Sequence, residues 1–137
     1  MRRMLIVTMG AAWLAVAGCS LVRPESPKVD LRGTWIAEDI DGAGVIDNAQ
    51  ATLDFAPNGR VAGRGGCNRY SGSVTTSGAS ILMGELVSTK MACAPALMDQ
   101  ETRYMAALQA VRSYRMEDSN LVLVDATGKP RLRFSRE

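Results

Sequence analysis

Few side chains in this sequence have the chemistry of catalytic groups. The chain contains no histidine, which removes the usual general base, the Ser-His-Asp and Cys-His arrangements of hydrolases and most catalytic zinc sites. The carboxylates of Glu38, Asp39 and Asp41 cluster at an expected strand end, and no pair stands out for glycoside cleavage. A serine and a lysine occur together in the stretch 88–90, where a solvated turn is the ordinary interpretation. We therefore expect a protein that is not an enzyme, with no catalytic residue, cofactor or metal site.

The first nineteen residues form a mostly apolar N-terminal stretch that ends at a cysteine, a residue that can be modified covalently. Arg2 and Arg3 form a short basic start, residues 4–18 contain no charge, and Cys19 follows. A basic start, an apolar stretch and small residues before a break make a secretory signal, which is too short to span a bilayer comfortably. The end of the stretch, Val-Ala-Gly-Cys, resembles the bacterial lipobox, in which the cysteine is diacylated and becomes the new N-terminus.

The lipobox resemblance implies a lipoprotein with a signal peptide at 1–18 and a lipidated N-terminus and tether at 19–29. Acyl chains of the palmitate type anchor a protein stably when there are two or more, because each buried methylene contributes about 0.8 kcal/mol. Ser20 is not the acidic retention signal of enterobacteria, so we expect the outer membrane, facing the periplasm. An ordinary signal peptide in which Cys19 is incidental remains the alternative.

Removal of the signal peptide changes the charge balance. The whole chain carries 16 basic and 14 acidic side chains for a net charge of +2, and the loss of Arg2 and Arg3 leaves 14 of each. No basic stripe with interleaved aromatic residues occurs, so nucleic-acid binding is not expected. The remaining 119 residues (137 minus 18) are enough for one domain, which we place at 30–137.

The domain has short alternating segments separated by turn residues, a pattern typical of an antiparallel β protein. Alternating segments between turn residues predict strands at 34–37, 51–55, 60–62, 70–74, 79–83, 113–116, 121–125 and 131–134. Asn58 and Gly59 between two of them are a strong hairpin signal. Gly63, Gly65 and Gly66 interrupt the returning strand and predict a bulge or tight bend where no side chain fits.

One segment breaks this rhythm and predicts an amphipathic helix over 95–112. It starts with proline, which suits a first turn, and has no glycine, while Tyr104 and Leu108 recur at helical spacing. Asp99 and Glu101 stand near its start, where acidic residues suit the helix dipole. The methionines on the apolar side are interpreted as core filling.

Four sequence blocks in order resemble a known family. They are Gly-Thr-Trp at 33–35, GCN-x-x-x-G at 66–72, T-x-M-x-C at 89–93 and L-x-L at 121–123, with the helix before the last block. This order is similar to that of the META domain, also termed HslJ-like, of bacterial envelope proteins. The resemblance implies an α+β, mostly β fold, in which an antiparallel, barrel-like sheet has one amphipathic helix packed against it.

The META resemblance also implies a class of function. Members are small envelope proteins linked with stress resistance, with no biochemical activity defined for the family, and some resemble pilotin lipoproteins that escort outer-membrane secretins. We therefore expect an envelope lipoprotein with an interaction or stress-resistance role, which meets the membrane through Cys19 and another envelope protein through its domain.

Two other interpretations of the function stay open. The Gly-Thr-Trp block at 33–35 also matches the G-x-W opening of lipocalins, and an eight-stranded barrel can hold one small molecule or lipid. An inhibitor-type lipoprotein that blocks an attacking enzyme would need no more than a disulfide-tied β domain. A small ligand is therefore not excluded by the sequence.

Two cysteines, Cys67 and Cys93, remain once Cys19 is acylated. An even pair in an oxidising compartment indicates a disulfide. It would close a loop of 26 residues (93 minus 67), which contributes roughly 3.5 kcal/mol in the chain-entropy model. Two buried free thiols are an alternative, and so is a redox-active pair, because Cys93 lies near the start of a helix.

The residues around Cys67 form a candidate interaction or structural motif, made of Gly65, Gly66, Asn68 and Gly72. As structure, asparagine and glycine tolerate left-handed backbone and satisfy nearby amides in a bend. As function, a glycine-lined surface lets a ligand or the backbone of a partner approach closely. The bend is the simpler interpretation.

Overall fold

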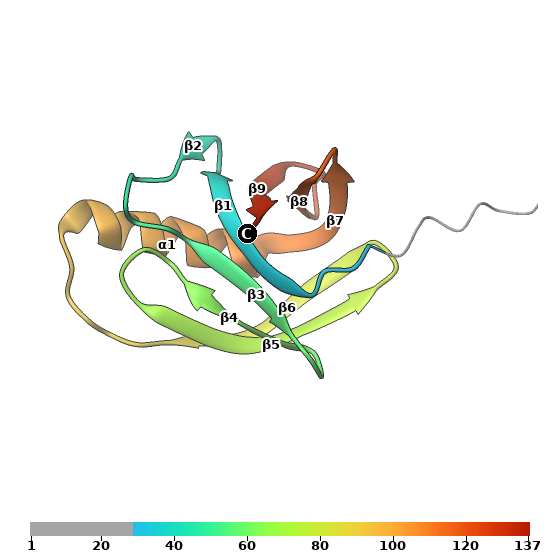
Figure 1. The fold of residues 1–137 in the computed structure, drawn as a ribbon, viewed down its shortest axis with the longest axis horizontal. Helices are drawn as coiled ribbons and strands as arrows, with labels where there is room; N and C mark the ends of the chain where they lie inside the picture. Colours follow the sequence, from blue (N-terminus) through green and yellow to red (C-terminus); the bar gives the residue numbers. More distant parts are fainter. Residues whose placement is uncertain (1–28) are drawn as a thin grey trace, which may run out of the picture.

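The structure is a computed structural model that describes residues 29–137. The expected signal peptide, the expected lipidation site Cys19 and residues 20–28 of the expected tether lie outside the described residues. The described part contains one helix, α1 (Pro95–Ala110), and nine strands (Figure 1). The strands are β1 (Gly33–Ile40), β2 (Ala43–Gly44), β3 (Thr52–Ala56), β4 (Arg60–Arg64), β5 (Arg69–Ser77), β6 (Ser80–Ser88), β7 (Val111–Glu117), β8 (Asn120–Asp125) and β9 (Pro130–Arg136).

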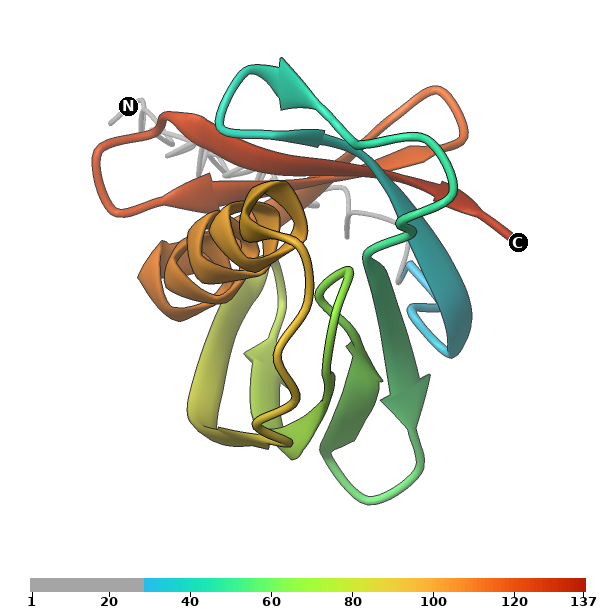
Figure 2. The ribbon, with the colours of Figure 1, turned by 90° about the vertical axis from the view of Figure 1, so that its left-hand side faces the viewer.

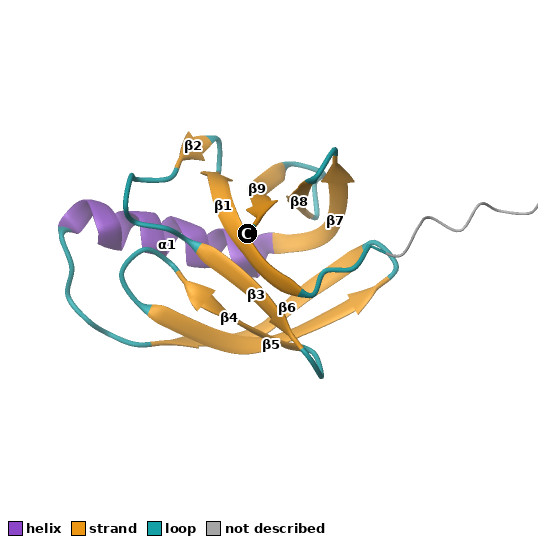
Figure 3. Ribbon diagram, in the orientation of Figure 1, coloured by secondary structure: helices purple, strands orange, loops and turns teal. Residues whose placement is uncertain are grey.

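Eight of these strands close into an antiparallel barrel. Neighbours follow the order β1-β3-β4-β5-β6-β7-β8-β9, and β9 pairs back onto β1, which closes the sheet. The short β2 adds to the far end of β1. Figure 3 shows the strands wrapped around a common interior with α1 along one side. The expected α+β, mostly β architecture, an antiparallel barrel with one helix packed against it, is confirmed.

The hairpin signals of the sequence become tight turns. Asn58 and Gly59 both have positive φ, 64° and 68°, a left-handed backbone that asparagine and glycine tolerate, and they lie in a connection of three residues, 57–59, between the paired Ala56 and Arg60. β3 and β4 pair from Ala56↔Arg60 to Thr52↔Arg64 as a result. The turn residues thereby fix the register of this hairpin.

The helix begins at Pro95 as predicted, but it ends earlier than predicted and its first turn differs from the expectation. It ends at Ala110, since Val111 has an extended backbone (φ −68°, ψ 146°) and begins β7, so the predicted range of 95–112 is two residues too long. The first turn holds no acidic residue. The prediction that Glu101 serves the helix dipole is therefore wrong, and its carboxylate is used elsewhere. Within residues 29–137, no helix is long and apolar enough to cross a membrane.

Bulky side chains fill the interior of the barrel. Trp35, Tyr104 and Phe134 are fully buried and are among the largest side chains there. The ring of Tyr104 meets that of Phe134 edge-on, with centroids 6.3 Å apart, so α1 contributes to the same core as the strands. The indole of Trp35 donates to the carbonyl of Leu31 at 2.9 Å, which satisfies its buried N–H.

The barrel is loosest between β6 and β7. Their pairing consists of Ser80↔Ser113 with a hydrogen bond from the Tyr114 amide to the Ala79 carbonyl at 2.9 Å. Beyond this point α1 lies against β6 and β9 (Figure 2). The Gln109 side chain donates to the Gly84 carbonyl of β6 at 3.1 Å. Beyond Ser80, the edge of β6 therefore faces α1. A fully paired barrel would have β7 at this place.

Candidate functional site

The four residues between β4 and β5, Gly65 to Asn68, form a tight turn that α1 packs against. The Gly65 amide donates to the Asn68 carbonyl at 3.1 Å, and Gly66 has a φ of +121°. A Cβ at Gly65 would lie 2.6 Å from the Glu101 Cγ, so the helix leaves no room for a side chain. The bend predicted from the glycines is confirmed.

A single carboxylate on the helix holds this turn. Glu101 accepts hydrogen bonds from the amides of Cys67, at 3.1 Å, and Asn68, and from the Asn68 side-chain amide at 2.8 Å. Bonds to an ionised acceptor are roughly twice as strong as neutral ones. The packing of α1 shields this turn from water. Glu101 accepts the three hydrogen bonds that water would otherwise accept from the turn.

Asn68 joins this turn to the segment that leads into the helix. It is buried, with 6% of its surface exposed. Its side-chain oxygen accepts from the Met91 amide at 2.7 Å and from the Thr89 hydroxyl at 2.9 Å. The side chain therefore ties β5, the 89–93 segment and α1 together, and the bend interpretation of Asn68 accounts for all of these contacts.

The same two segments are joined covalently. Cys67 and Cys93 form a disulfide with a Cα–Cα distance of 6.0 Å, inside the normal range. Cys93 stands two residues before Pro95, where α1 begins. The bond thus connects the turn to the entry of the helix, as the sequence suggested for a structural disulfide.

Two further polar contacts of α1 are buried. Gln100 is fully buried; it donates to the Ala49 carbonyl at 2.7 Å and accepts from the Ile46 amide at 2.8 Å. The hydroxyls of Tyr70 and Tyr104 lie 3.0 Å apart, and both reach the Thr52 carbonyl. Burial raises the pKa of both tyrosines above the ordinary value of 10.0, so both are protonated at neutral pH.

Gly72 does not belong to this cluster. It lies on β5 beside the β5–β6 irregularity, and a Cβ there would lie 2.4 Å from the Glu85 carbonyl oxygen. Close strand packing explains this glycine. The structure therefore brings together Gly65, Gly66, Cys67, Asn68 and Cys93 and places Gly72 apart from them.

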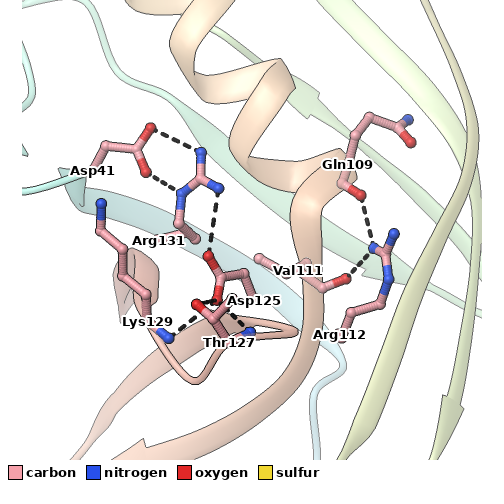
Figure 4. Close-up of polar contacts among 8 residues, drawn as sticks. All are labelled: Asp41, Gln109, Val111, Arg112, Asp125, Thr127, Lys129 and Arg131. Carbon is pink, nitrogen blue, oxygen red and sulfur yellow. Dashed lines mark hydrogen bonds and ion pairs between the residues drawn. The ribbon is translucent and has the colours of Figure 1, made fainter.

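An ionic cluster lies elsewhere, at the β8–β9 turn (Figure 4). Arg131 lies between Asp41, with which it forms a two-pronged ion pair, and Asp125 at 3.7 Å. Asp125 also accepts from the hydroxyl and amide of Thr127 and from the Lys129 amide. The bond from Thr127, the largest cause, lowers the pKa of Asp125. These contacts fix the turn to Asp41, the residue that follows β1.

A groove follows the open edge of β6. It has a volume of about 430 Å³. Leu86, Ser88 and Lys90 line one wall, and the other wall is the exposed side of α1: Glu101, Thr102, Met105, Ala106 and Gln109. The walls are mostly neutral, with the two charged groups near one end. This surface combines a helix face with an edge of β6 that, beyond Ser80, pairs with no other strand within residues 29–137.

The sequence pointed to Asn68 as part of a bend, but it did not point to Glu101, which holds the turn. Glu101 and Asn68 are 33 positions apart, and no local pattern reports such a contact. Gln100 could have been found, because it stands four residues before Tyr104 and eight before Leu108, on the buried face of the helix. A polar residue there predicts a buried hydrogen-bonding partner.

Comparison with known proteins gives a family and a fold. Residues 29–137 match the family model described as the META domain. An NMR structure of a protein from Burkholderia xenovorans is similar, with 24% identity and a TM-score of 0.61 over 84% of this chain and 97% of that one. A second NMR structure has 23% identity and a TM-score of 0.62 over 77% of this chain and 89% of that one.

A third solved structure extends the fold to another family. It is the crystal structure of a DUF4847 family protein from Bacteroides vulgatus, with 16% identity and a TM-score of 0.56 over 77% of this chain and 92% of that one. No curated protein matches the chain.

Proposed function

Because the chain belongs to the META domain family, we propose that it is a non-enzymatic interaction module of the bacterial cell envelope, held at a membrane by a lipid on Cys19. The lipobox-like end of the apolar N-terminal stretch supports the anchor. The absence of histidine from the sequence supports a binding role over catalysis. Glu101, the carboxylate nearest the turn, is already engaged by three donors.

The observation that carries the proposal is the unpaired edge of β6 in the groove beside α1. Tyr70↔Ser88 and Ser71↔Val87 are opposed on the β5 side, and the Thr89 amide donates to the Arg69 carbonyl at 3.0 Å. In an antiparallel ladder, alternate residues turn their backbone groups to opposite sides. Val87 therefore faces β5, whereas the amide and carbonyl of Leu86 and Ser88 face the groove.

Such an edge has the chemistry to bind an extended peptide. Backbone donors and acceptors along a strand give affinity for any added strand, and the side chains around it give specificity. Leu86, Met105 and Ala106 would contact apolar residues of that peptide. The proposed partner is therefore an extended segment of another envelope protein, added to β6.

The charge of Lys90 favours an acidic residue at one end of the bound segment. Within the described residues, Lys90 has no carboxylate within ion-pair distance, and it lines the groove where β6 ends. Glu101 beside it is engaged by the turn and offers little to an incoming peptide. An acidic residue at that end of the segment would pair with Lys90.

The packed barrel interior is less suited to the lipocalin-like alternative. Trp35, Tyr104 and Phe134 occupy the interior with no exposed surface, whereas a barrel that holds a ligand needs an interior cavity. An inhibitor-type lipoprotein would use the same groove against an enzyme and is one outcome of the test below.

The test is site-specific photo-crosslinking from the full-length chain in intact cells. A photo-reactive residue replaces Thr102, which is exposed and lines the groove. The matched control replaces Leu82, which is exposed on β6 but does not line the groove. Mass spectrometry identifies the crosslinked protein and the segment attached. The proposal expects one envelope protein, crosslinked through an extended segment from position 102 and not from position 82.

A groove-filling variant decides whether the contact is specific. Ala106→Arg places a long side chain into the groove from an exposed helix position, and should abolish the crosslink from position 102 while the unfolding midpoint stays unchanged. An undiminished crosslink in Ala106→Arg, or equal crosslinks from positions 102 and 82, would contradict the proposal.

A further inference from the structure

Three arginines of the β4–β5 hairpin have no side-chain hydrogen-bond or ion-pair partner within residues 29–137, unlike most arginines of the described residues. Carboxylates or backbone carbonyls hold six others: Arg32, Arg112, Arg115, Arg131, Arg133 and Arg136. Within residues 29–137, Arg60, Arg64 and Arg69 have no such side-chain partner, and all three are exposed. Arg103 on α1 also lacks one and stands by itself on the helix. The hairpin thus concentrates unpaired positive charge on one surface.

Two of these arginines lie directly opposite each other. Arg64 of β4 and Arg69 of β5 are register partners. Val61 and Tyr70 are buried in the barrel, so the alternation of side chains along each strand turns Arg64 and Arg69 to the outer face. Like charges directly opposite each other destabilise a strand pair. An anion between the two guanidinium groups would relieve this repulsion.

The turn network described above holds this pair in place. Arg64 and Arg69 flank the Gly65–Asn68 turn, which Glu101 and the disulfide fix to the helix. The Arg64 amide donates to the Thr52 hydroxyl at 3.1 Å, and the Arg69 amide donates to the Thr89 hydroxyl at 3.3 Å. The backbones of both arginines are therefore positioned before any ligand arrives.

The surface beside the pair is hollow. A depression of about 300 Å³ is lined by Arg64 and Arg69, by the small residues Ala62 and Gly63, and by Thr34, Thr52, Asp54 and Tyr70. Ala62 and Gly63 have little or no side chain, so they leave this part of the surface open beside the arginines. Hydroxyl groups of the threonines add neutral donors to the two cationic forks.

We propose that Arg64 and Arg69 form a binding site for a phosphate group on the outer face of β3, β4 and β5. Arginine forks match the oxygens of phosphate in pairs, and two opposed forks with a hydroxyl at Thr52 suit a tetrahedral anion. The site lies on other strands than the β6 groove and does not depend on the proposed function.

Asp54 gives the site a preference among phosphates. It lines the same hollow and stands on β3 opposite Ala62, two positions from Arg64 along β4. A carboxylate at that place repels a free dianion, and it attracts a cation carried at the other end of a phosphate ester. The phosphate group therefore comes either from free phosphate or from a lipid headgroup ester. Among esters, we expect Asp54 to favour phosphoethanolamine, because its ammonium group can pair with the carboxylate.

The test follows the arginine side-chain Nε–Hε signals by NMR in the purified full chain. Three probes are titrated at constant ionic strength: inorganic phosphate, glycerophosphoethanolamine and glycerophosphoglycerol. The variants are Arg64→Gln and Arg69→Gln, with Arg103→Gln as the control that removes the same charge from α1. Saturable shifts at Arg64 and Arg69 are expected, with affinity reduced roughly tenfold in either hairpin variant and unchanged in Arg103→Gln.

The outcomes separate the ligand sources and can overturn the proposal. Binding of the ethanolamine ester above the glycerol ester, with the preference lost in Asp54→Asn, assigns the headgroup. Binding of inorganic phosphate alone, strengthened in Asp54→Asn, assigns free phosphate. No saturable shift up to about 10 mM of any probe, or equal losses in Arg103→Gln and the hairpin variants, would refute the site.

Discussion

At the scale of single residues, Glu101 has the widest structural effect on the candidate site. One carboxylate accepts from two backbone amides and one side-chain amide of the Cys67–Asn68 turn. The sequence suggested a helix-dipole role for it, because position and charge are all that a sequence displays. The contact with Asn68 joins residues 33 positions apart, and no local sequence pattern reports a contact of that separation.

Replacement of Glu101 by glutamine should destabilise the domain. The change keeps the size of the side chain but removes the charge and turns one acceptor into a donor that faces other donors. We expect a loss of about 1–3 kcal/mol in the free energy of unfolding, measured by urea denaturation. The control is Asp99→Asn, an exposed acidic position of the same helix, which should change little. Equal effects of the two variants would show that the turn does not depend on Glu101.

The buried tyrosine pair predicts a loss of stability at alkaline pH. Burial raises the pKa of Tyr70 and Tyr104 in the folded state, so the unfolded state loses these protons first. The stabilisation is complete below pH 10 and declines as the pH rises above that value. In Tyr70→Phe one titrating group is gone, so the decline in unfolding free energy above pH 10 should be shallower than in the wild type. An identical pH profile would contradict this assignment.

At the scale of elements, the local sequence predicted the strands and the helix well, but it did not predict how the strands close into a barrel. Alternation and Asn58-Gly59 located the β3–β4 hairpin, because both are local signals. The β1–β9 pairing joins residues about a hundred positions apart, and only the family resemblance suggested a barrel. The loose β6–β7 junction has no sequence signal at all, because an unpaired edge and a paired edge have the same residue pattern.

The disulfide is an element-scale constraint between the β4–β5 turn and the start of α1. The double variant Cys67→Ser/Cys93→Ser should lose roughly 3.5 kcal/mol of unfolding free energy in the chain-entropy model. The measurement is urea denaturation with and without reductant. Reductant should destabilise the wild type to the level of the variant and leave the variant unchanged. A wild type that is indifferent to reductant would contradict a stabilising disulfide.

At the scale of the whole molecule, the proposal combines a membrane anchor with a rigid barrel that presents two outer surfaces. The anchor rests on Cys19 alone, so Cys19→Ser should leave the folded domain intact and release the protein from the membrane fraction. Intact-mass spectrometry of the wild type should show the added acyl groups, and the variant should lack them. A wild type without lipid, or a variant that stays membrane-bound, would contradict the anchor.

The partner-binding groove is the central claim, and hydrogen exchange of the β6 amides tests it most directly. The probe is a synthetic peptide with the sequence of the segment crosslinked from position 102, added to the purified domain. Strand addition predicts slower exchange at Leu86 and Ser88, whose amides face the groove, with little change at Val87, which already faces β5. Unchanged exchange at Leu86 and Ser88 with the peptide bound would show that the partner does not add a strand to β6.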